Sequence, residues 1–151
     1  MTNIIDKVRT LYDKFQTVSP ERLCRYLGIN LFYADLPEST DGIFYTVENE
    51  QIILVNQNLP SPNFPYVIAH ELGHALLHPE YNYMFMAGQT FMKTERYEIE
   101  ADYFAATLLM WELIKNNDLS AFTADQLAHS TGLRVECVEN WMSHTRHDQI
   151  C

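Results

Sequence analysis

The segment His70-Glu71-Leu72-Gly73-His74 has the residue types and the spacing of a metal-binding helix. In an α-helix, residues i and i+4 lie on one face, with Cβ atoms about 5–6 Å apart. The imidazoles of His70 and His74 can therefore reach one Zn²⁺ ion at roughly 2.0–2.1 Å. Glu71 follows the first histidine, and it can take a proton from an attacking water and pass it to a leaving amine. The pattern predicts zinc-assisted hydrolysis of a peptide bond.

A catalytic zinc ion needs a third protein ligand and one open coordination position. No histidine follows in the HExxHxxGxxH pattern, so we expect a carboxylate from a second helix. On that helix, Ala101, Asp102 and Ala105 lie within about 60° of Glu98, whereas Glu100 points roughly 160° away. The two alanines would allow close packing, and Asp102 could accept the free N–H of a zinc-bound histidine. We predict Glu98 as the third ligand, with Asp102 behind the histidines and Glu100 as the alternative ligand.

The composition limits the class of protein. Hydrophobic residues make up 47% of the 151 residues, and no stretch approaches the roughly 18 uninterrupted apolar residues of a membrane span. The N-terminal segment is charged throughout, unlike a secretory signal, so we expect a cytoplasmic protein. Three widely spaced cysteines argue against a disulfide framework and against a cysteine-based zinc site. The net charge of −10 argues against nucleic acid or a membrane as the partner and favours a protein.

Residues 123–142 have the length of a helix-turn-helix, with Gly132 at the turn. A DNA-reading second helix would carry basic residues, but here Arg134 stands with Glu136 and Glu139. We therefore interpret this segment as packing helices, or as a contact for a protein partner.

The elements that position the predicted site can be predicted from apolar spacing and from residues typical of helix ends. Ser19-Pro20-Glu21 begins a short helix that Gly28 ends, and Pro79 stops the helix that carries the two histidines. Segments rich in β-branched and aromatic residues flank Glu48-Asn49-Glu50, which predicts a hairpin. The expected helices are residues 3–16, 20–28, 65–77, 94–115, 123–132 and 134–143, and the expected strands are residues 29–34, 42–47 and 51–56.

This order of elements predicts an α+β fold, a single domain over residues 1–151 with a small antiparallel sheet packed against several helices. The N-terminal helices and the three-stranded sheet would occupy residues 1–60. The zinc-site helices would occupy residues 63–115 and bind one Zn²⁺ ion, and a C-terminal helical tail would occupy residues 120–145. We expect an extended substrate to add alongside an exposed strand of the hairpin.

Two motifs resemble the ImmA/IrrE family of bacterial and phage metallopeptidases. VIAHELGHALLH followed by EIEADYFAATLLM is similar to the family pattern HELGHxLLH followed by ExEA(N/D)xFAxxLLMP, with Trp111 where the family often has proline. The resemblance implies a zincin-like fold of the gluzincin type and a zinc endopeptidase in which His70, His74 and Glu98 bind the metal and Glu71 is the base. It also implies a protein substrate, a helix-turn-helix repressor of a mobile element or stress regulon.

A second interpretation is a non-hydrolytic protein that binds or senses a repressor and contains a structural zinc ion. A structural zinc site does not need a carboxylic acid beside its ligands, whereas peptide hydrolysis does. Glu71 therefore favours a zinc metallopeptidase, with a DNA-binding repressor as its protein substrate.

Overall fold

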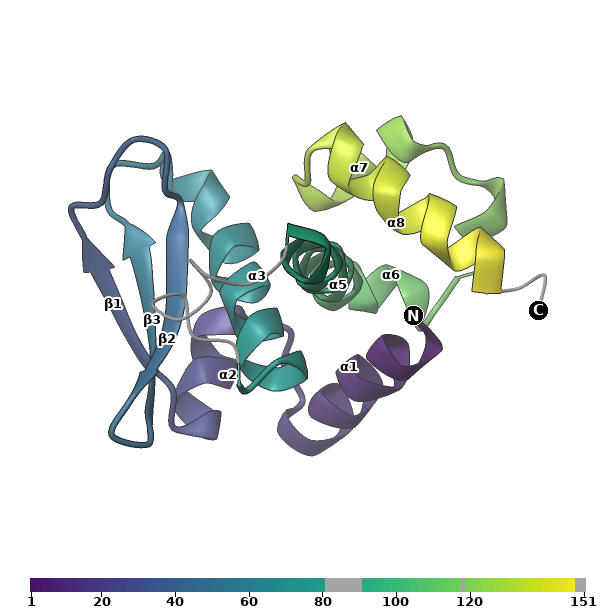
Figure 1. Cartoon of the computed structure of the whole chain (residues 1–151). Coiled ribbons are helices and arrows are strands. Elements are labelled where there is room, and N and C mark those ends of the chain that lie inside the picture. Colours follow the sequence, from purple (N-terminus) through teal and green to yellow (C-terminus); the bar gives the residue numbers. More distant parts are fainter. Residues whose placement is uncertain (81–90, 118, 149–151) are drawn as a thin grey trace.

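The computed structural model describes residues 1–80, 91–117 and 119–148 of the chain. A small sheet forms one side of the molecule and helices fill the rest (Figure 1). The helices are α1 (Thr2–Phe15), α2 (Pro20–Leu27), α3 (Phe64–Leu77), α5 (Phe91–Leu109), α6 (Trp111–Ile114), α7 (Ala124–Thr131) and α8 (Val135–Asp148), and the strands are β1 (Asn30–Ala34), β2 (Gly42–Val47) and β3 (Glu50–Asn56). The predicted α+β class is confirmed.

The sheet is mixed, which corrects the prediction of a wholly antiparallel sheet. Its strand order is β1-β3-β2, with β2 antiparallel and β1 parallel to β3. Strands that are consecutive in sequence are usually neighbours, but β1 pairs with β3 rather than with β2. Here the β2–β3 hairpin turns β3 back into the middle of the sheet, where it runs in the direction of β1. Glu48 and Asn49 form the hairpin turn with φ values of 49° and 68°, as a two-residue type I′ turn requires.

The predicted ends of α2 and α7 are confirmed. Ser19 Oγ accepts a hydrogen bond from a backbone N–H in the first turn of α2, and Gly28 follows the last residue with φ of 72°. Thr123 and Gln126 form a reciprocal capping box at the start of α7, and Gly132 follows its end, also with φ of 72°. Both glycines have the left-handed conformation in which a side chain is strained.

The long helix predicted over residues 94–115 is two helices in the structure. α5 ends at Leu109 and α6 begins at Trp111, because Met110 leaves the helical region with φ of −92° and ψ of 1°. Neither glycine nor proline marks this position, so the helical sequence pattern continues through the break. The last helix, α8, extends to Asp148, beyond the end predicted at residue 143.

α3 is the central helix of the fold, between the sheet and α5 (Figure 1). It contacts β2 and β3 on one side and α5 on the other, and α8 packs against the far side of α5. The indole N–H of Trp141 donates to Thr107 Oγ1 at 2.9 Å, a buried hydrogen bond that joins α8 to α5. The buried apolar side chains of these elements form one continuous core.

Within the described residues, no helix is both long and apolar enough to cross a membrane. Cys24 and Cys137 are free thiols, and Cys151 lies outside the described residues. Burial raises the pKa of the Cys24 thiol to about 12, so this side chain remains a neutral part of the core.

Candidate metal centre

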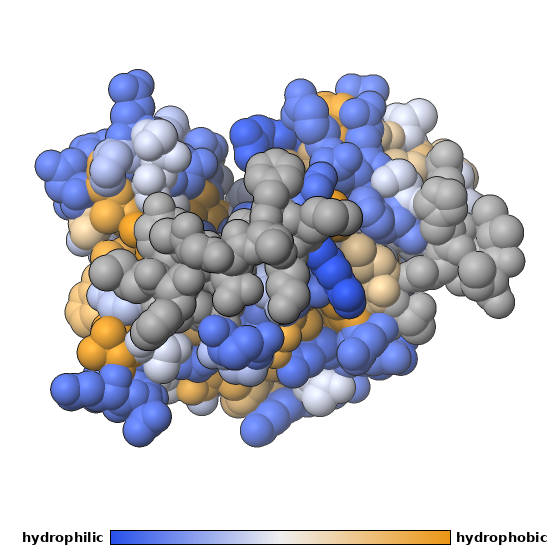
Figure 2. Space-filling view, in the orientation of Figure 1, coloured by the Kyte–Doolittle hydropathy of each residue, from blue (hydrophilic) through white to orange (hydrophobic). Residues whose placement is uncertain are grey.

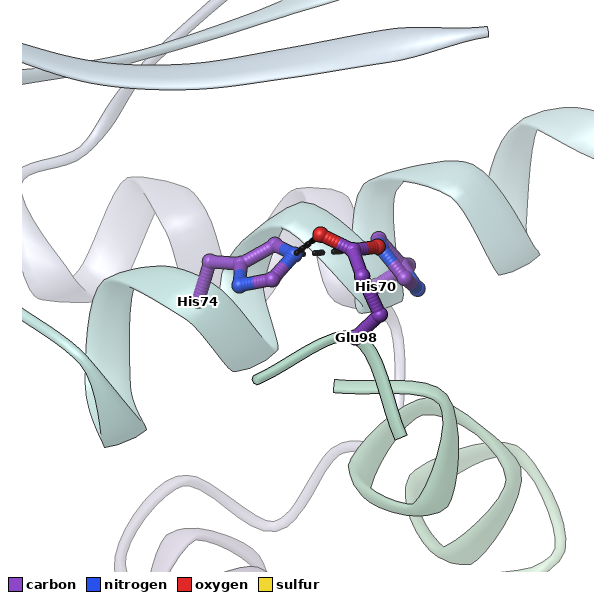
Figure 3. Close-up of side chains that lie close together, drawn as sticks. All are labelled: His70, His74 and Glu98. Atoms are coloured by element: carbon purple, nitrogen blue, oxygen red, sulfur yellow. Dashed lines mark hydrogen bonds and ion pairs between the residues drawn. The ribbon is translucent and has the colours of Figure 1, made fainter. Parts of the chain in front are cut away.

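His70 and His74 lie on the face of α3 that is turned toward α5. Their Nε2 atoms are 3.2 Å apart and their ring centroids 4.8 Å apart, as the spacing of one helical turn predicts. His74 is only 1% exposed, so packing holds its ring in place. Figure 3 shows the two rings side by side along α3, with the Glu98 carboxylate facing both.

Glu98 reaches the histidines from α5. Its Oε2 atom lies 3.1 Å from His70 Nε2, and its Oε1 atom lies 3.3 Å from His74 Nε2. The Glu98 side chain is 42% exposed, so it also faces open space. Glu100 lies elsewhere, with Oε2 3.1 Å from the Nε2 atom of His78. The structure therefore brings Glu98, rather than Glu100, to the histidine pair.

The three side chains fit a divalent metal ion. One potential ligand atom from each of His70, His74 and Glu98 lies within 4.8 Å of the other two. Two nitrogen ligands at roughly 2.0–2.1 Å from a tetrahedral ion are about 3.3–3.4 Å apart. The observed Nε2–Nε2 distance of 3.2 Å is close to this separation. Two imidazoles and one carboxylate would leave the fourth position of a tetrahedral ion open.

Asp102 lies behind His70, on the side away from His74. Its Oδ1 atom accepts hydrogen bonds from His70 Nδ1 at 2.8 Å and from the Tyr66 hydroxyl at 2.6 Å. Because Asp102 engages Nδ1, the Nε2 atom of His70 is left to face Glu98 and His74. Tyr66 is absent from the predicted site, although it lies four residues before His70 on the same helix face. The spacing that pairs the histidines could have identified it.

The acids around His70 favour positive charge at its ring. Burial lowers the pKa of His70, but hydrogen bonds to Asp102 and Glu98 outweigh burial and raise this pKa to about 10. Burial raises the pKa of both carboxyl groups, yet their hydrogen bonds with the histidines hold both pKa values below the usual range. The carboxylates are thus ionised at neutral pH. The same charges that stabilise a proton on His70 would stabilise a metal cation beside it.

Glu71 lies against the first residues of β2. It is 7% exposed, and the backbone of Phe44 hydrogen-bonds to its carboxyl group. A Cβ atom on Gly42 would lie 2.7 Å from Cγ1 of Val67 and 3.0 Å from both Cγ and Oε1 of Glu71, so a larger residue here would displace these side chains. Burial raises the pKa of Glu71, and the two neighbouring imidazoles oppose that rise. Gly42 and Phe44 are missing from the predicted site, because only the folded chain brings β2 over α3.

Gly73 allows α3 and α5 to approach closely beside the histidines. A Cβ atom at this position would lie 3.1 Å from the Cα atom of Ala101 and 3.2 Å from Cδ1 of Phe104. Ala101 is fully buried at this contact. The predicted close packing of the two helices is confirmed here, and Glu98 lies one turn before Ala101 on α5.

The residues of the centre line a cleft of about 410 Å³ between the sheet and the α7–α8 pair. Residues 39–44 form the sheet side, and residues 132–134, the turn between α7 and α8, form the other. Figure 2 shows the surface hollowed between these two sides. The buried Asn56 amide fixes the segment that enters β2, because it donates to the backbone oxygens of residues 36, 37 and 40 at 3.0–3.2 Å.

Known proteins are similar in sequence to this chain over most of its length. Residues 24–132 match the model of a peptidase family described as the IrrE N-terminal-like domain. The chain is 34% identical over 131 residues to uncharacterized immunity region protein 2 of Bacillus phage phi105, and the alignment covers 85% of this chain and 82% of that protein. It is 26% identical over 126 residues to metallopeptidase ImmA of Bacillus subtilis strain 168, with 81% and 73% covered. The chain therefore belongs to the ImmA/IrrE family of metallopeptidases.

Proposed function

We propose that the chain is a zinc-dependent endopeptidase in which His70, His74 and Glu98 hold the metal ion. The observation that carries this proposal is the convergence of two imidazoles and one carboxylate in a cleft, with the Glu71 carboxyl group beside them. Family membership supports metallopeptidase activity in general. The choice of zinc is supported by the donor set, because two histidines and a glutamate are typical of catalytic zinc.

Glu71 would act as the general base and then as the general acid. A bound divalent ion supplies Lewis acidity, which polarises the scissile carbonyl and makes a nearby water more acidic. Glu71 takes the proton from the attacking water and delivers it to the leaving nitrogen. Burial raises the pKa of Glu71 and favours uptake of this proton, and the charge of a bound metal ion would oppose that rise. Asp102 holds the His70 ring through Nδ1 and keeps Nε2 directed at the metal position.

The outer edge of β2 would bind the substrate backbone. Among the strands of the described residues, β2 lies at the edge of the sheet, with its inner side paired with β3. The two-residue turn makes Val47 and Glu50 a hydrogen-bonded pair. Alternation along an antiparallel ladder then directs the N–H groups of Gly42, Phe44 and Thr46 toward the outer edge, where that of Phe44 already donates to the Glu71 carboxyl group. A peptide added there as a strand would cross the cleft next to Glu71.

The proposed substrate is a helix-turn-helix repressor of a mobile element or stress regulon. The motif resemblance implies this class. This substrate class is also supported by a phage protein, similar to this chain, whose name refers to an immunity region. A basic DNA-binding protein would also be attracted to a chain of net charge −10.

The proposal is tested by incubating the purified protein with the repressor encoded beside its gene, first with a chelator and then after zinc is added back. We expect cleavage at one position that stops on chelation and returns with zinc. Mass spectrometry of the fragments identifies that position. Cleavage that survives chelation would contradict a metal-dependent mechanism. Zinc-dependent cleavage of other peptides with an intact repressor would contradict only the proposed substrate.

A further inference from the structure

The turn between α7 and α8 is a firmly attached wall of the cleft. Gly132 ends α7, and the next two residues line the cleft opposite β2. The buried hydrogen bond from Trp141 to Thr107 fixes α8 on α5, the helix that carries Glu98. The turn therefore has a defined position relative to the proposed metal centre, and a peptide lying along β2 would pass in front of it.

Arg134 gives this wall its charge. Among the described residues that line the cleft, it is the only lysine or arginine, whereas four lining residues are acidic: Asp41, Glu71, Glu98 and Asp102. Its side chain is exposed, and the guanidinium carbon lies 5.8 Å from the centre of the Tyr66 ring. The hydroxyl of that ring donates to Asp102. The cation is thus held one aromatic ring away from the centre, in an arrangement that cation–π attraction favours.

The surroundings leave the guanidinium able to meet a ligand. Cys137, one turn along α8, contacts it, and Asp41 attracts it from the sheet side of the cleft. An exposed guanidinium can offer two parallel N–H groups to a planar carboxylate, which is the geometry that arginine recognises best. The backbone of an extended peptide would already be bound by the edge of β2. The group that Arg134 selects is therefore expected on a side chain or at a chain end.

We propose that Arg134 binds a carboxylate of the peptide in the cleft. The cleft would then prefer an acidic side chain, or the free C-terminal carboxylate, on the part of the peptide that lies against the α7–α8 turn. This inference rests on the proposed peptidase function and adds a substrate chemistry to the same cleft. Arg134 would make the cleft locally attractive to an acid, in a chain whose net charge of −10 repels acids.

The experiment measures binding in the zinc-loaded Glu71→Gln protein, so that peptides can be captured without relying on cleavage. This protein, with and without Arg134→Glu, is immobilised and exposed to a random decapeptide library, and the retained peptides are sequenced. We expect Asp and Glu to be enriched at one position, and Lys and Arg to replace them with Arg134→Glu. The library is used with free and with amidated C-termini. Retention that is lost on amidation and with Arg134→Glu identifies the terminal carboxylate as the ligand, and enrichment of Asp and Glu that persists on amidation identifies a side chain.

Arg25→Glu is the matched control, because Arg25 is exposed on α2, outside the cleft, and the change in charge is the same. It should leave the preference unaltered. For one retained acidic peptide, Arg134→Ala should weaken binding roughly 1.5- to fivefold, the range of an exposed charge pair.

The inference is overturned if binding depends neither on an acidic side chain nor on a free C-terminal carboxylate, or if Arg134→Glu and Arg25→Glu alter that dependence equally. A library that is not retained at all also overturns it. The proposed function fails separately: an acidic preference that depends on Arg134, in a wild-type protein that cleaves no retained peptide, would contradict the peptidase while the binding inference stands.

Discussion

Glu98 and Glu100 are two residues apart on α5, and their carboxylates have different partners. Glu98 faces the Nε2 atoms of both site histidines. Glu100 pairs with His78 Nε2 at 3.1 Å and with Arg96 Nε at 2.8 Å. The rotation of about 200° between positions i and i+2 of a helix separates the two acids. The sequence was sufficient to favour Glu98 for this reason, because the choice depends only on geometry within one helix.

Substituting each acid separately should distinguish these roles. Glu98→Gln should lower zinc affinity by more than about 100-fold, because changes to outer-shell partners alone cost about 10–100-fold. Glu100→Gln keeps an oxygen that can accept a hydrogen bond and should leave zinc affinity unchanged. Competition against a chromophoric chelator measures both affinities. Equal losses, or a larger loss from Glu100→Gln, would show that Glu98 is not the third ligand.

The contact between α3 and α5 is the element-level feature that assembles the centre. Gly73 and the small residue Ala101 indicate this contact in the sequence. In the structure, backbone and side-chain atoms of α5 lie 3.1–3.3 Å from the position of a Cβ atom on Gly73. Other features of the elements give no local signal. Met110 interrupts the helix without a breaking residue, and β1 pairs parallel with β3 because of where the hairpin lies in the sheet. Pairing between distant strands is decided by tertiary packing rather than by local pattern.

Gly73→Val should separate the two helices and disturb the centre. Its branched side chain has no space against Ala101, so we expect a loss of roughly 1–3 kcal/mol in the free energy of unfolding and weaker zinc binding. Gly28→Val is the matched control. It is strained by the left-handed backbone, with nothing within 4 Å of its Cβ position, and should cost about 1–2 kcal/mol. Denaturant unfolding and zinc titration test both variants. Equal zinc affinities in the two would contradict the proposed role of the contact.

At the scale of the whole molecule, the cleft joins four parts of the chain that are far apart in sequence. The residues before and within β2 cover Glu71, α3 and α5 supply the proposed ligands, and the α7–α8 turn closes the other side. Spacing along the chain predicts neighbours on one helix, which is why the histidine pair could be identified. It does not indicate which strand covers Glu71 or that Arg134 lies over Tyr66, because these contacts depend on how whole elements pack.

A proline at Thr46 should test whether the outer edge of β2, which continues beyond the cleft, binds the peptide backbone. Thr46→Pro removes an N–H group that the hairpin register directs away from β3. We expect slower cleavage of an extended peptide, chiefly through a higher KM. Thr46→Ala retains the N–H group and should cleave at the wild-type rate. Thermal unfolding verifies that both variants are folded. Equal kinetic constants for the two variants would contradict strand addition at β2.

The central claim is that this metallopeptidase uses Glu71 as its base, and the most direct test is the cleavage rate of zinc-loaded Glu71→Gln. The amide has nearly the shape of the carboxylate and does not contribute a ligand, so zinc content should equal that of the wild type. We predict that kcat for a peptide that the wild type cleaves falls by roughly 10²–10⁴-fold, the usual contribution of a general base. Cleavage by the fully loaded variant at the wild-type rate would contradict the account.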